Sequence, residues 1–265
     1  MKTKKTEQTG RSELASEWIY GLNPVLEALK AGRTIKKIFL SSNRHDKIEG
    51  IKKEAGLRKI PVKIAEPFFF DQQFSKGHQG IAAEVAVKGY ISLDELLSIP
   101  SARKELPLFV ILDCIEDPRN LGAILRVADA AGVHGIIIQS HRSAGLGAEV
   151  SKVSAGAVEY VPVCMVTNIK HAIHELKDKE ITIIGAEATG ENSVWDIDLS
   201  VPVALVIGSE GKGLRKTVGS LCDLLVNIPM LGKINSLNVS VATGILAFEI
   251  MRQRIRKSKN LKEIL

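Results

Sequence analysis

The segment NIPMLGKINSLNVSVATGILAFEI, residues 227–250, carries the strongest fold signal in the chain. It begins at the end of a short apolar run and passes through Pro229 and Gly232 into a long apolar stretch. Four polar residues lie at the start of that stretch: Asn235, Ser236, Asn238 and Ser240. A helix cap explains one or two of them. We therefore expect a strand, a polar loop that contacts a ligand, and a final helix over residues 239–257.

The segment VALVIGSEGKGL, residues 203–214, has a similar organisation. An apolar strand pattern runs into a turn that contains Gly208, Glu210, Gly211 and Gly213. Such a turn exposes backbone N–H and C=O groups closely enough to bind a nucleoside or a phosphate, although a simple left-handed turn has the same composition. The dinucleotide fingerprint is absent, since it needs GxGxxG after the first strand and an acidic residue about 20 positions later.

A third segment, DCIEDPRNLGAILRVADAAGVHG at residues 113–135, follows another apolar run. Asn120 is placed to cap a helix, and Gly122 allows another backbone to approach. Arg126 lies six residues beyond Asn120, among apolar neighbours. This arginine fits either a surface ion pair or the binding of a phosphate or developing oxyanion through its planar fork of donors.

The second part of the chain is built from short apolar runs, most of them separated by helical patterns. They lie at residues 108–113, 135–139, 160–166, 181–186, 203–208 and 224–229. Strands that are buried on both faces have this composition, which predicts a mainly parallel sheet covered by helices, an α/β fold. Ligands bind at the carboxyl ends of the strands in such sheets, where the three polar segments lie.

The N-terminal part predicts a small α/β domain over residues 18–88. Asn23 is a suitable helix N-cap, Pro24 suits the first helical position, and Gly32 lies just past the expected end. Strands are expected at residues 35–40, 61–65 and 80–87.

Composition divides the remainder of the chain. Residues 1–17 have no apolar stretch, so we expect a flexible tail and not a signal peptide. Residues 89–106, with Pro100 and several charges, predict a linker with a short amphipathic piece around residues 93–99, before a larger domain over residues 107–258.

The basic residues are concentrated in the first third of the chain. Residues 1–90 contain 17 Lys and Arg against 10 Asp and Glu, whereas residues 91–265 contain 19 against 20. A basic module beside a near-neutral one favours an anionic partner such as nucleic acid, although chance asymmetry of a solvated surface would look the same. No apolar run approaches the roughly 18 residues of a membrane span.

The three cysteines, Cys114, Cys164 and Cys222, are far apart and form no CxxC pair. This spacing argues against a metal site and against a disulfide framework. We expect buried core cysteines in a protein of the reducing cytoplasm.

Taken together, the three segments resemble the SpoU/TrmH family of RNA ribose 2′-O-methyltransferases, within the SPOUT class. The resemblance covers about residues 18–257, nearly the whole chain. The three family motifs are matched by Asn120, Gly122 and Arg126, by Gly208, Glu210 and Gly213, and by IPMLGKINSLNVSVA at residues 228–242. All three motifs occur in order, each at a predicted strand end, which makes the match specific.

The N-terminal part also resembles a known module. YGLNPVLEAL at residues 20–29 and HQGIAAEV at residues 78–85 are similar to the RNA-binding domain of the RlmB-like branch. That branch methylates a guanosine of 23S ribosomal RNA in the bacterial large subunit, so the resemblance implies this substrate.

The resemblance implies a deep trefoil knot near the C-terminus and a homodimer whose active sites lie at the interface. It implies that the knotted loops hold S-adenosylmethionine. The residues expected to bind it are Gly208, Gly213, Ile228, Met230 and Leu237.

The resemblance also implies the catalytic residues. Arg126 is expected to be central, either as a general base or, because a guanidinium hardly ever loses its proton, as a group that fixes a phosphate and stabilises the emerging alkoxide. Ser236 and Asn238 would orient the ribose and Arg126, while Asn120 and Glu210 would brace the loops.

Three other functions compete with this one. The same chemistry could act on a transfer RNA or on another ribosomal site, because RNA is recognised largely by shape and unstacked bases. A non-catalytic RNA-binding or ribosome-assembly protein would not need Arg126, Glu210, Ser236 and Asn238 together. A nicotinamide-dependent enzyme is disfavoured by the missing early GxGxxG.

Overall fold

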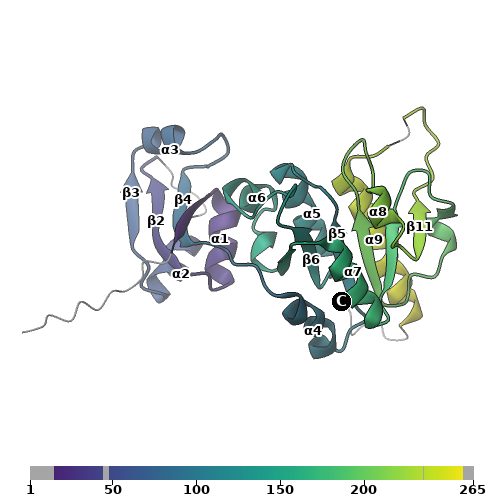
Figure 1. Ribbon diagram of the computed structural model, residues 1–265. Helices are drawn as coiled ribbons and strands as arrows, with labels where there is room; N and C mark the ends of the chain where they lie inside the picture. Colours follow the sequence, from purple (N-terminus) through teal and green to yellow (C-terminus); the bar gives the residue numbers. More distant parts are fainter. Residues whose placement is uncertain (1–14, 44–47, 235, 259–265) are drawn as a thin grey trace, which may run out of the picture.

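The computed structural model of the chain describes residues 15–43, 48–234 and 236–258. Figure 1 shows a small α/β unit at one end, followed by a larger α/β unit that contains the C-terminal helix. The elements in chain order are β1 (Ser16–Tyr20), α1 (Leu22–Lys30), β2 (Ile35–Ser41), α2 (Glu49–Leu57), β3 (Val62–Ala65), α3 (Pro67–Gln73), β4 (Ile81–Ala86), α4 (Leu93–Arg103), β5 (Leu108–Leu112), α5 (Pro118–Ala130), β6 (Gly135–Gln139), α6 (Ala148–Val153), the 3₁₀ helix η1 (Ala157–Glu159), β7 (Val163–Val166), α7 (Ile169–Asp178), β8 (Thr182–Ala186), β9 (Asn192–Ser193), the 3₁₀ helix η2 (Val194–Asp196), β10 (Val203–Ile207), α8 (Lys216–Gly219), β11 (Leu224–Asn227) and α9 (Val239–Lys257).

The larger unit is built on a parallel sheet, as the sequence predicted. Within the described residues its strand order is β7-β6-β5-β10-β8-β11-β9, and all neighbouring pairs are parallel. Strand β5 is buried on both faces because alternate side chains enter different cores. Val110 packs with α5 and α9 in one core, whereas Phe109 and Ile111 pack with α4 and α7 in the other.

Helix α5 is amphipathic, which explains how it covers the sheet. Its buried residues follow helical spacing: Leu121, Ile124, Leu125 and Ala128. The helix begins at Pro118 and its N-cap is Asp117, whose carboxylate accepts a hydrogen bond from the Arg119 backbone N–H at 2.8 Å. The expectation that Asn120 caps this helix is therefore wrong. Proline suits the first helical position, so the cap falls one residue before it.

The small unit has a four-stranded sheet of order β1-β4-β2-β3. Helices α1 and α2 cover one face with buried aliphatic residues such as Val25 and Ile51. Helix α3 covers the other face, where aromatic rings including Trp18, Phe39 and Phe74 pack together. Strand β1 was not expected from the sequence. It is a short edge strand whose pairing with β4, and not its own pattern, stabilises it.

The structure changes three local expectations in this region. Helix α1 begins at Leu22 with Gly21 as N-cap, so Asn23 is already helical. The predicted flexible tail, residues 1–17, is too long, because Ser16 and Glu17 pair with β4 as part of β1. Residues 1–14 lie outside the described residues. The expected linker at residues 89–106 is largely folded, since α4 packs on β7.

Two further observations concern side chains and helices. Of the three cysteines only Cys164 is fully buried, while Cys114 and Cys222 are half-buried, and all three are free. No helix in the described part of the chain is long and apolar enough to cross a membrane. The trefoil knot stays a prediction.

Candidate functional site

A cavity of about 370 Å³ lies at the carboxyl ends of three neighbouring strands, β10, β8 and β11. This edge of a parallel sheet is the usual ligand-binding edge, because strand-end loops and helix N-termini meet there. The first turns of α9 close one side with Val239 and Ala242. The cavity is lined by residues of the turn after β10, the turn after β8 and the loop before α9: Glu187, Gly208, Ser209, Glu210, Gly211, Lys212, Gly213, Ile228, Met230, Ser236 and Leu237.

The glycine turn after β10 is a tight backbone loop. The Ser209 N–H donates to the Gly213 carbonyl at 3.1 Å, and the Gly213 N–H donates back to the Ser209 carbonyl at 3.0 Å. A Cβ atom at Gly208 would lie 2.2 Å from the Gly213 carbonyl carbon, and Gly213 itself has φ +63°. Only glycine fits at position 208, so the turn presents bare backbone to the cavity.

Glu187, at the end of β8, is a cavity residue that the sequence analysis missed. Its carboxylate accepts a hydrogen bond from the Leu214 N–H at 3.3 Å, and a Cβ atom at Gly213 would lie 2.8 Å from Glu187 Oε1. It follows an apolar run directly, so the rule that pointed to the other strand ends could have found it. Glu187 and Glu210 place two carboxylates on the cavity wall.

A buried carboxylate anchors the far end of the glycine turn. Asp113, at the end of β5, is fully buried and accepts hydrogen bonds from the Arg215 backbone N–H at 3.0 Å and from Arg215 Nε at 2.7 Å. Arg215 also donates to Gln139 Oε1 at 2.8 Å. This network ties the turn to the ends of β5 and β6. The sequence predicts that Asp113 lies at a strand end but does not indicate its partner, which lies 102 residues away.

Asn238 joins the three motif segments. Its side-chain amide donates to Asn120 Oδ1 at 3.1 Å and to Glu210 Oε1 at 2.5 Å. Its side-chain oxygen accepts the Ser240 backbone N–H at 3.0 Å, so the residue also caps α9. Asn120, Glu210 and Asn238 come from three separate segments of the sequence and meet beside the cavity.

The other predicted site residues, apart from Arg126, line the cavity. The five residues expected to bind the cofactor all line the cavity: Gly208, Gly213, Ile228, Met230 and Leu237. Ser236 lines it as well. Asn235, from the polar cluster of the sequence, lies outside the described residues.

Arg126 is not brought into the cavity of this chain. It is exposed on α5, and six residues correspond to about one and two-thirds helical turns, so it points to a different side of α5 from Asn120. Its neighbour Val127 faces Gly244 of α9. Arg126 therefore lies on the exposed surface of α5, next to the contact between α5 and α9.

Asp117, the N-cap of α5, forms an ion pair with the Arg119 side chain at 3.1 Å. A hydrogen bond from the Arg119 side chain lowers the pKa of the Asp117 carboxyl below its ordinary value. In the described residues, no group of three or more His, Cys, Asp or Glu side chains could hold a metal ion. The fold and the site together define an α/β protein with a cavity of about 370 Å³ at its strand ends, joined to a basic module.

Comparison with known families identifies the class. Residues 107–248 match the model of the SpoU rRNA methylase family, and residues 18–90 match that for RNA 2′-O ribose methyltransferase substrate binding. The chain therefore belongs to the SpoU rRNA methylase family. The predicted family and enzymatic class, an RNA 2′-O-ribose methyltransferase, are confirmed.

Relatives match over nearly the whole chain. A Bacillus subtilis protein, YacO, assigned to the TrmH family of tRNA/rRNA methyltransferases, is 40% identical over 90% of this chain and 96% of its own length. The structure of the SpoU methyltransferase AviRb from Streptomyces viridochromogenes in complex with AdoMet has a TM-score of 0.77 at 25% identity, covering 91% of both chains.

Two further solved structures differ in how much of the chain they match. The AdoMet-bound rRNA methyltransferase of Sinorhizobium meliloti has a TM-score of 0.72 at 27% identity, covering 89% of this chain and 87% of its own. The TrmH/SpoU tRNA modifying enzyme of A. aeolicus has a TM-score of 0.54 at 30% identity, covering 62% of this chain and 83% of its own.

Proposed function

We propose that this protein transfers a methyl group from S-adenosylmethionine to the ribose 2′-hydroxyl of a guanosine in 23S ribosomal RNA. The observation that carries the proposal is the meeting of Asn120, Glu210 and Asn238 beside a cavity lined by the glycine turn. Side chains from three distant segments of the sequence are joined by hydrogen bonds at the edge where α/β enzymes bind ligands.

The cavity suits the proposed methyl donor in size, shape and charge. Its volume of about 370 Å³ lies within the range of small-ligand sites. A Cβ atom at Gly208 would clash with the Gly213 backbone, so only glycine permits this tight turn, whose backbone groups line the cavity and can contact a nucleoside. The lining carries the carboxylates of Glu187 and Glu210 and the ammonium group of Lys212, and the resulting negative balance complements a positively charged ligand.

The residues beside the cavity can perform the remaining tasks of the reaction. S-adenosylmethionine supplies a methyl group that is activated by a positively charged sulfur. The attacking 2′-hydroxyl must be aligned with that group and must lose its proton as it attacks. We assign alignment of the ribose to Ser236 and Asn238, and bracing of their loops to Asn120 and Glu210. We assign binding of the neighbouring phosphate and stabilisation of the alkoxide to Arg126.

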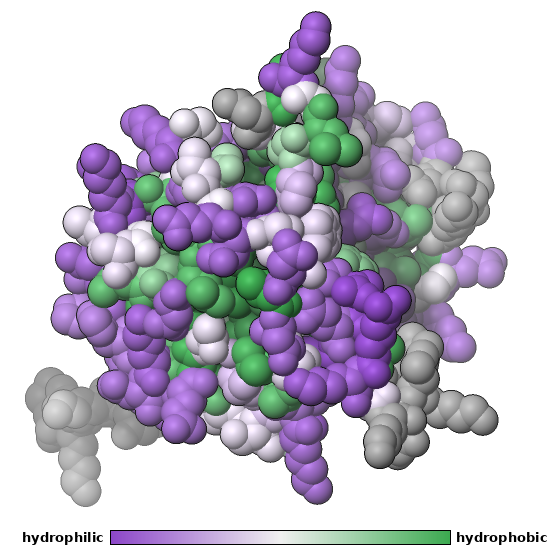
Figure 2. Space-filling model, turned by 90° about the vertical axis from the view of Figure 1, so that its right-hand side faces the viewer, coloured by the Kyte–Doolittle hydropathy of each residue, from purple (hydrophilic) through white to green (hydrophobic). Residues whose placement is uncertain are grey.

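We infer that the active form is a homodimer with its sites at the interface. Helix α9 packs on α5, yet it exposes Val241 by 49% and Phe248 by 41%. These residues are seven positions apart and lie on one face of the helix. Figure 2, which views the end of the molecule that carries the C-terminal elements, shows apolar patches among hydrophilic side chains. A second copy that packs against α9 would also cover Arg126 of the first copy. Arg126 would then lie in an active site that both chains form.

The choice of ribosomal RNA over transfer RNA rests on the N-terminal module. This module carries the basic excess of the chain, as an RNA-binding domain requires. The solved rRNA methyltransferase matches 89% of the chain, whereas the tRNA modifying enzyme matches 62%. The cytoplasmic location stays a prediction from the cysteine spacing.

The test is a methylation assay with two RNAs. The purified protein is incubated with methyl-labelled S-adenosylmethionine and unmodified bacterial large-subunit rRNA, with bulk tRNA in parallel, and the labelled nucleotide is mapped by mass spectrometry. We expect 2′-O-methylguanosine in the rRNA. Label in tRNA alone would keep the chemistry and overturn the substrate. Failure to bind S-adenosylmethionine in a calorimetric titration would overturn the proposal itself.

A further inference from the structure

Residues 148–160, which comprise α6 and η1, lie between the N-terminal module and the catalytic helix α5. We call them the bridge segment. Helix α6 contacts both β1 and α5, and η1 contacts both α1 and α5. In Figure 1, α6 stands between α1 and α5. The RNA-binding module is therefore connected to the helix that carries Asn120 and Arg126 through one short packed segment.

Glycines allow close packing on both sides of the bridge segment. On the α5 side, a Cβ atom at Gly122 would lie 2.7 Å from Val153 Cβ. On the module side, a Cβ atom at Gly156 would lie 2.6 Å from Glu27 Cβ, and Gly156 has φ +93°. A side chain at either position would push the layers apart. The layers are in direct van der Waals contact, which is how displacements are transmitted through packed structures.

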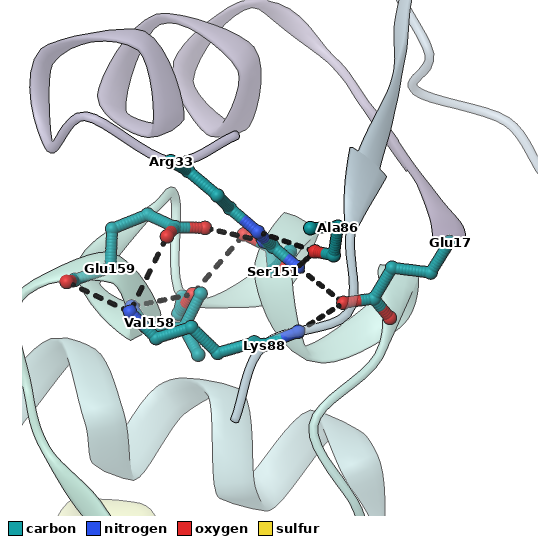
Figure 3. Close-up of polar contacts among 8 residues, drawn as sticks. Glu17, Arg33, Ala86, Lys88, Ser151, Val158 and Glu159 are labelled. Carbon is teal, nitrogen blue, oxygen red and sulfur yellow. Dashed lines mark hydrogen bonds and ion pairs between the residues drawn. The ribbon is translucent and has the colours of Figure 1, made fainter. Parts of the chain in front are cut away.

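A cluster of four charged side chains locks the module side of this interface (Figure 3). The Glu159 carboxylate of η1 accepts a hydrogen bond from Arg33 Nη1 at 2.7 Å and lies 3.5 Å from Lys88 Nζ. Arg33 also pairs with Glu17 and donates to the Ala86 carbonyl at 2.8 Å. The Arg33 and Glu159 side chains are only 6% and 2% exposed. They lie 126 residues apart in the sequence.

The cluster is balanced in charge, and each of its four charged side chains makes at least one hydrogen bond. It contains two cations, Arg33 and Lys88, and two carboxylates, Glu17 and Glu159. The Lys88 backbone N–H donates to Glu17 at 3.1 Å, and Lys88 Nζ donates to the Glu159 carbonyl at 3.1 Å. Separating the partners of a buried pair is costly, because it leaves a charge without a partner in a poorly solvated place. Salt screens buried pairs far less than exposed ones.

Domains of one chain move relative to each other by default when their interface is small and polar. Here the buried cluster and the glycine contacts oppose such motion. We propose that Arg33 and Glu159 are positioning residues for RNA methylation. They hold the N-terminal module in one orientation on the bridge segment, so that RNA bound by the module presents its ribose beside α5. This inference rests on the proposed function for its catalytic consequence.

The test uses the full-length protein with two substitution variants. Arg33→Met removes the cation that joins the two units. The double variant Arg33→Met/Glu159→Gln leaves Glu17 and Lys88 as a balanced pair and keeps the interface foldable if the single variant does not fold. Lys177→Met is the matched control, because Lys177, on α7, forms an ion pair with Asp223 that is far more exposed than the pair of Arg33 and Glu159. Hydrogen–deuterium exchange measures opening of residues 148–160 without any activity assay.

We expect the exchange rate of the bridge segment to rise at least about tenfold in both Arg33 variants, with no change in Lys177→Met. We expect kcat/KM for RNA to fall at least about tenfold, the scale of a misaligned reactant, while the Kd for S-adenosylmethionine stays the same. In wild type, protection of the bridge segment should persist in salt that weakens RNA binding.

Unchanged exchange in both Arg33 variants would overturn the proposal. So would faster exchange with normal RNA turnover, since the orientation would then not matter for methylation. Loss of S-adenosylmethionine binding in the double variant would show a general structural role and would also overturn it. A wild-type protein that methylates no RNA would refute the proposed function, and the exchange data would still decide whether Arg33 and Glu159 lock the module.

Discussion

The side-chain amide of Asn238 donates a 3.1 Å hydrogen bond to Asn120 Oδ1, although 118 residues separate the two in the sequence. Asn238 is the N-cap of α9 and Asn120 lies in the first turn of α5. The bond therefore ties together the starts of the two helices that pack on the same face of the parallel sheet. Glu210, from the glycine turn, joins them through the same amide group.

A double-mutant cycle tests this link. We expect Asn238→Ala to lower the free energy of unfolding by about 1 kcal/mol, because the cap of α9 is lost with the hydrogen bonds. Asn120→Ala should cost less, since Asn120 does not cap its helix. The double variant should reveal a coupling of at least about 0.5 kcal/mol in chemical denaturation. Strictly additive effects would mean that the two side chains do not interact in solution.

Substitution of Gly208 should weaken cofactor binding. In Gly208→Ala the new Cβ would lie 2.2 Å from the Gly213 carbonyl carbon, so the turn must move. We expect a loss of about 1–3 kcal/mol in stability, the usual cost of overpacking, and at least about a tenfold rise in the Kd for S-adenosylmethionine. Gly219→Ala is the control, because its Cβ would lie 4.0 Å from Leu214. An unchanged Kd in Gly208→Ala would contradict the assignment of the cavity.

Removal of Arg126 should affect turnover alone. The side chain is exposed and outside the cavity, so Arg126→Ala should fold and bind S-adenosylmethionine nearly as wild type does. We expect turnover to fall at least about a hundredfold, the scale of one positioned catalytic group. Single-turnover methylation and calorimetry measure the two quantities. The exposed Arg103 on α4, changed to alanine, provides the control, and near-normal turnover in Arg126→Ala would refute its role.

The proposed dimer interface can be tested at Phe248. We expect Phe248→Glu to shift the protein toward monomers in sedimentation equilibrium, with at least about a tenfold rise in the dissociation constant, because a charge would replace a buried apolar contact. Turnover should fall with the dimer fraction. Arg256→Glu changes the charge of an exposed residue on the same helix and should leave the dimer intact. A wild-type protein that is monomeric at micromolar concentration would exclude this interface.

The contact between Tyr160 and Glu27 predicts a pH dependence. The Tyr160 hydroxyl donates to Glu27 at 2.6 Å, and this hydrogen bond, followed by burial, raises the pKa of Tyr160 from 10 to about 12. The folded state thus favours the neutral phenol. Its contribution is complete below pH 10 and is lost as the pH rises toward 12. The unfolding free energy of wild type should therefore fall more steeply across this range than that of Tyr160→Phe; parallel curves would contradict the contact.

Local pattern was sufficient for the elements of the parallel sheet. Strand β6 and helix α9 have the bounds that the sequence predicts, 135–139 and 239–257. Buried strands need continuous apolar runs, and these are visible in one stretch of chain. The rule that ligands bind at strand ends then located most of the cavity residues.

Local pattern was misleading where pairing with a distant segment decides the structure. Strand β1 owes its existence to β4, and α1 begins at Leu22 and not after Asn23. The pairs Asp113–Arg215 and Arg33–Glu159 join residues that are 102 and 126 positions apart. Nothing in the sequence near any of these residues indicates the partner, because an ion pair between distant segments has no periodicity.

By itself, the sequence determined the fold class, the family and the residues of the three motifs, since each depends on residue types within a short window. Only the tertiary structure decided the strand order, the convergence on Asn238, the exposed position of Arg126 and the buried cluster around Glu159. These features depend on which distant segments are brought together and, for Glu159, on which side chains share a desolvated place. That choice is made by the packing of the whole chain, where an unpaired buried charge is too costly to persist.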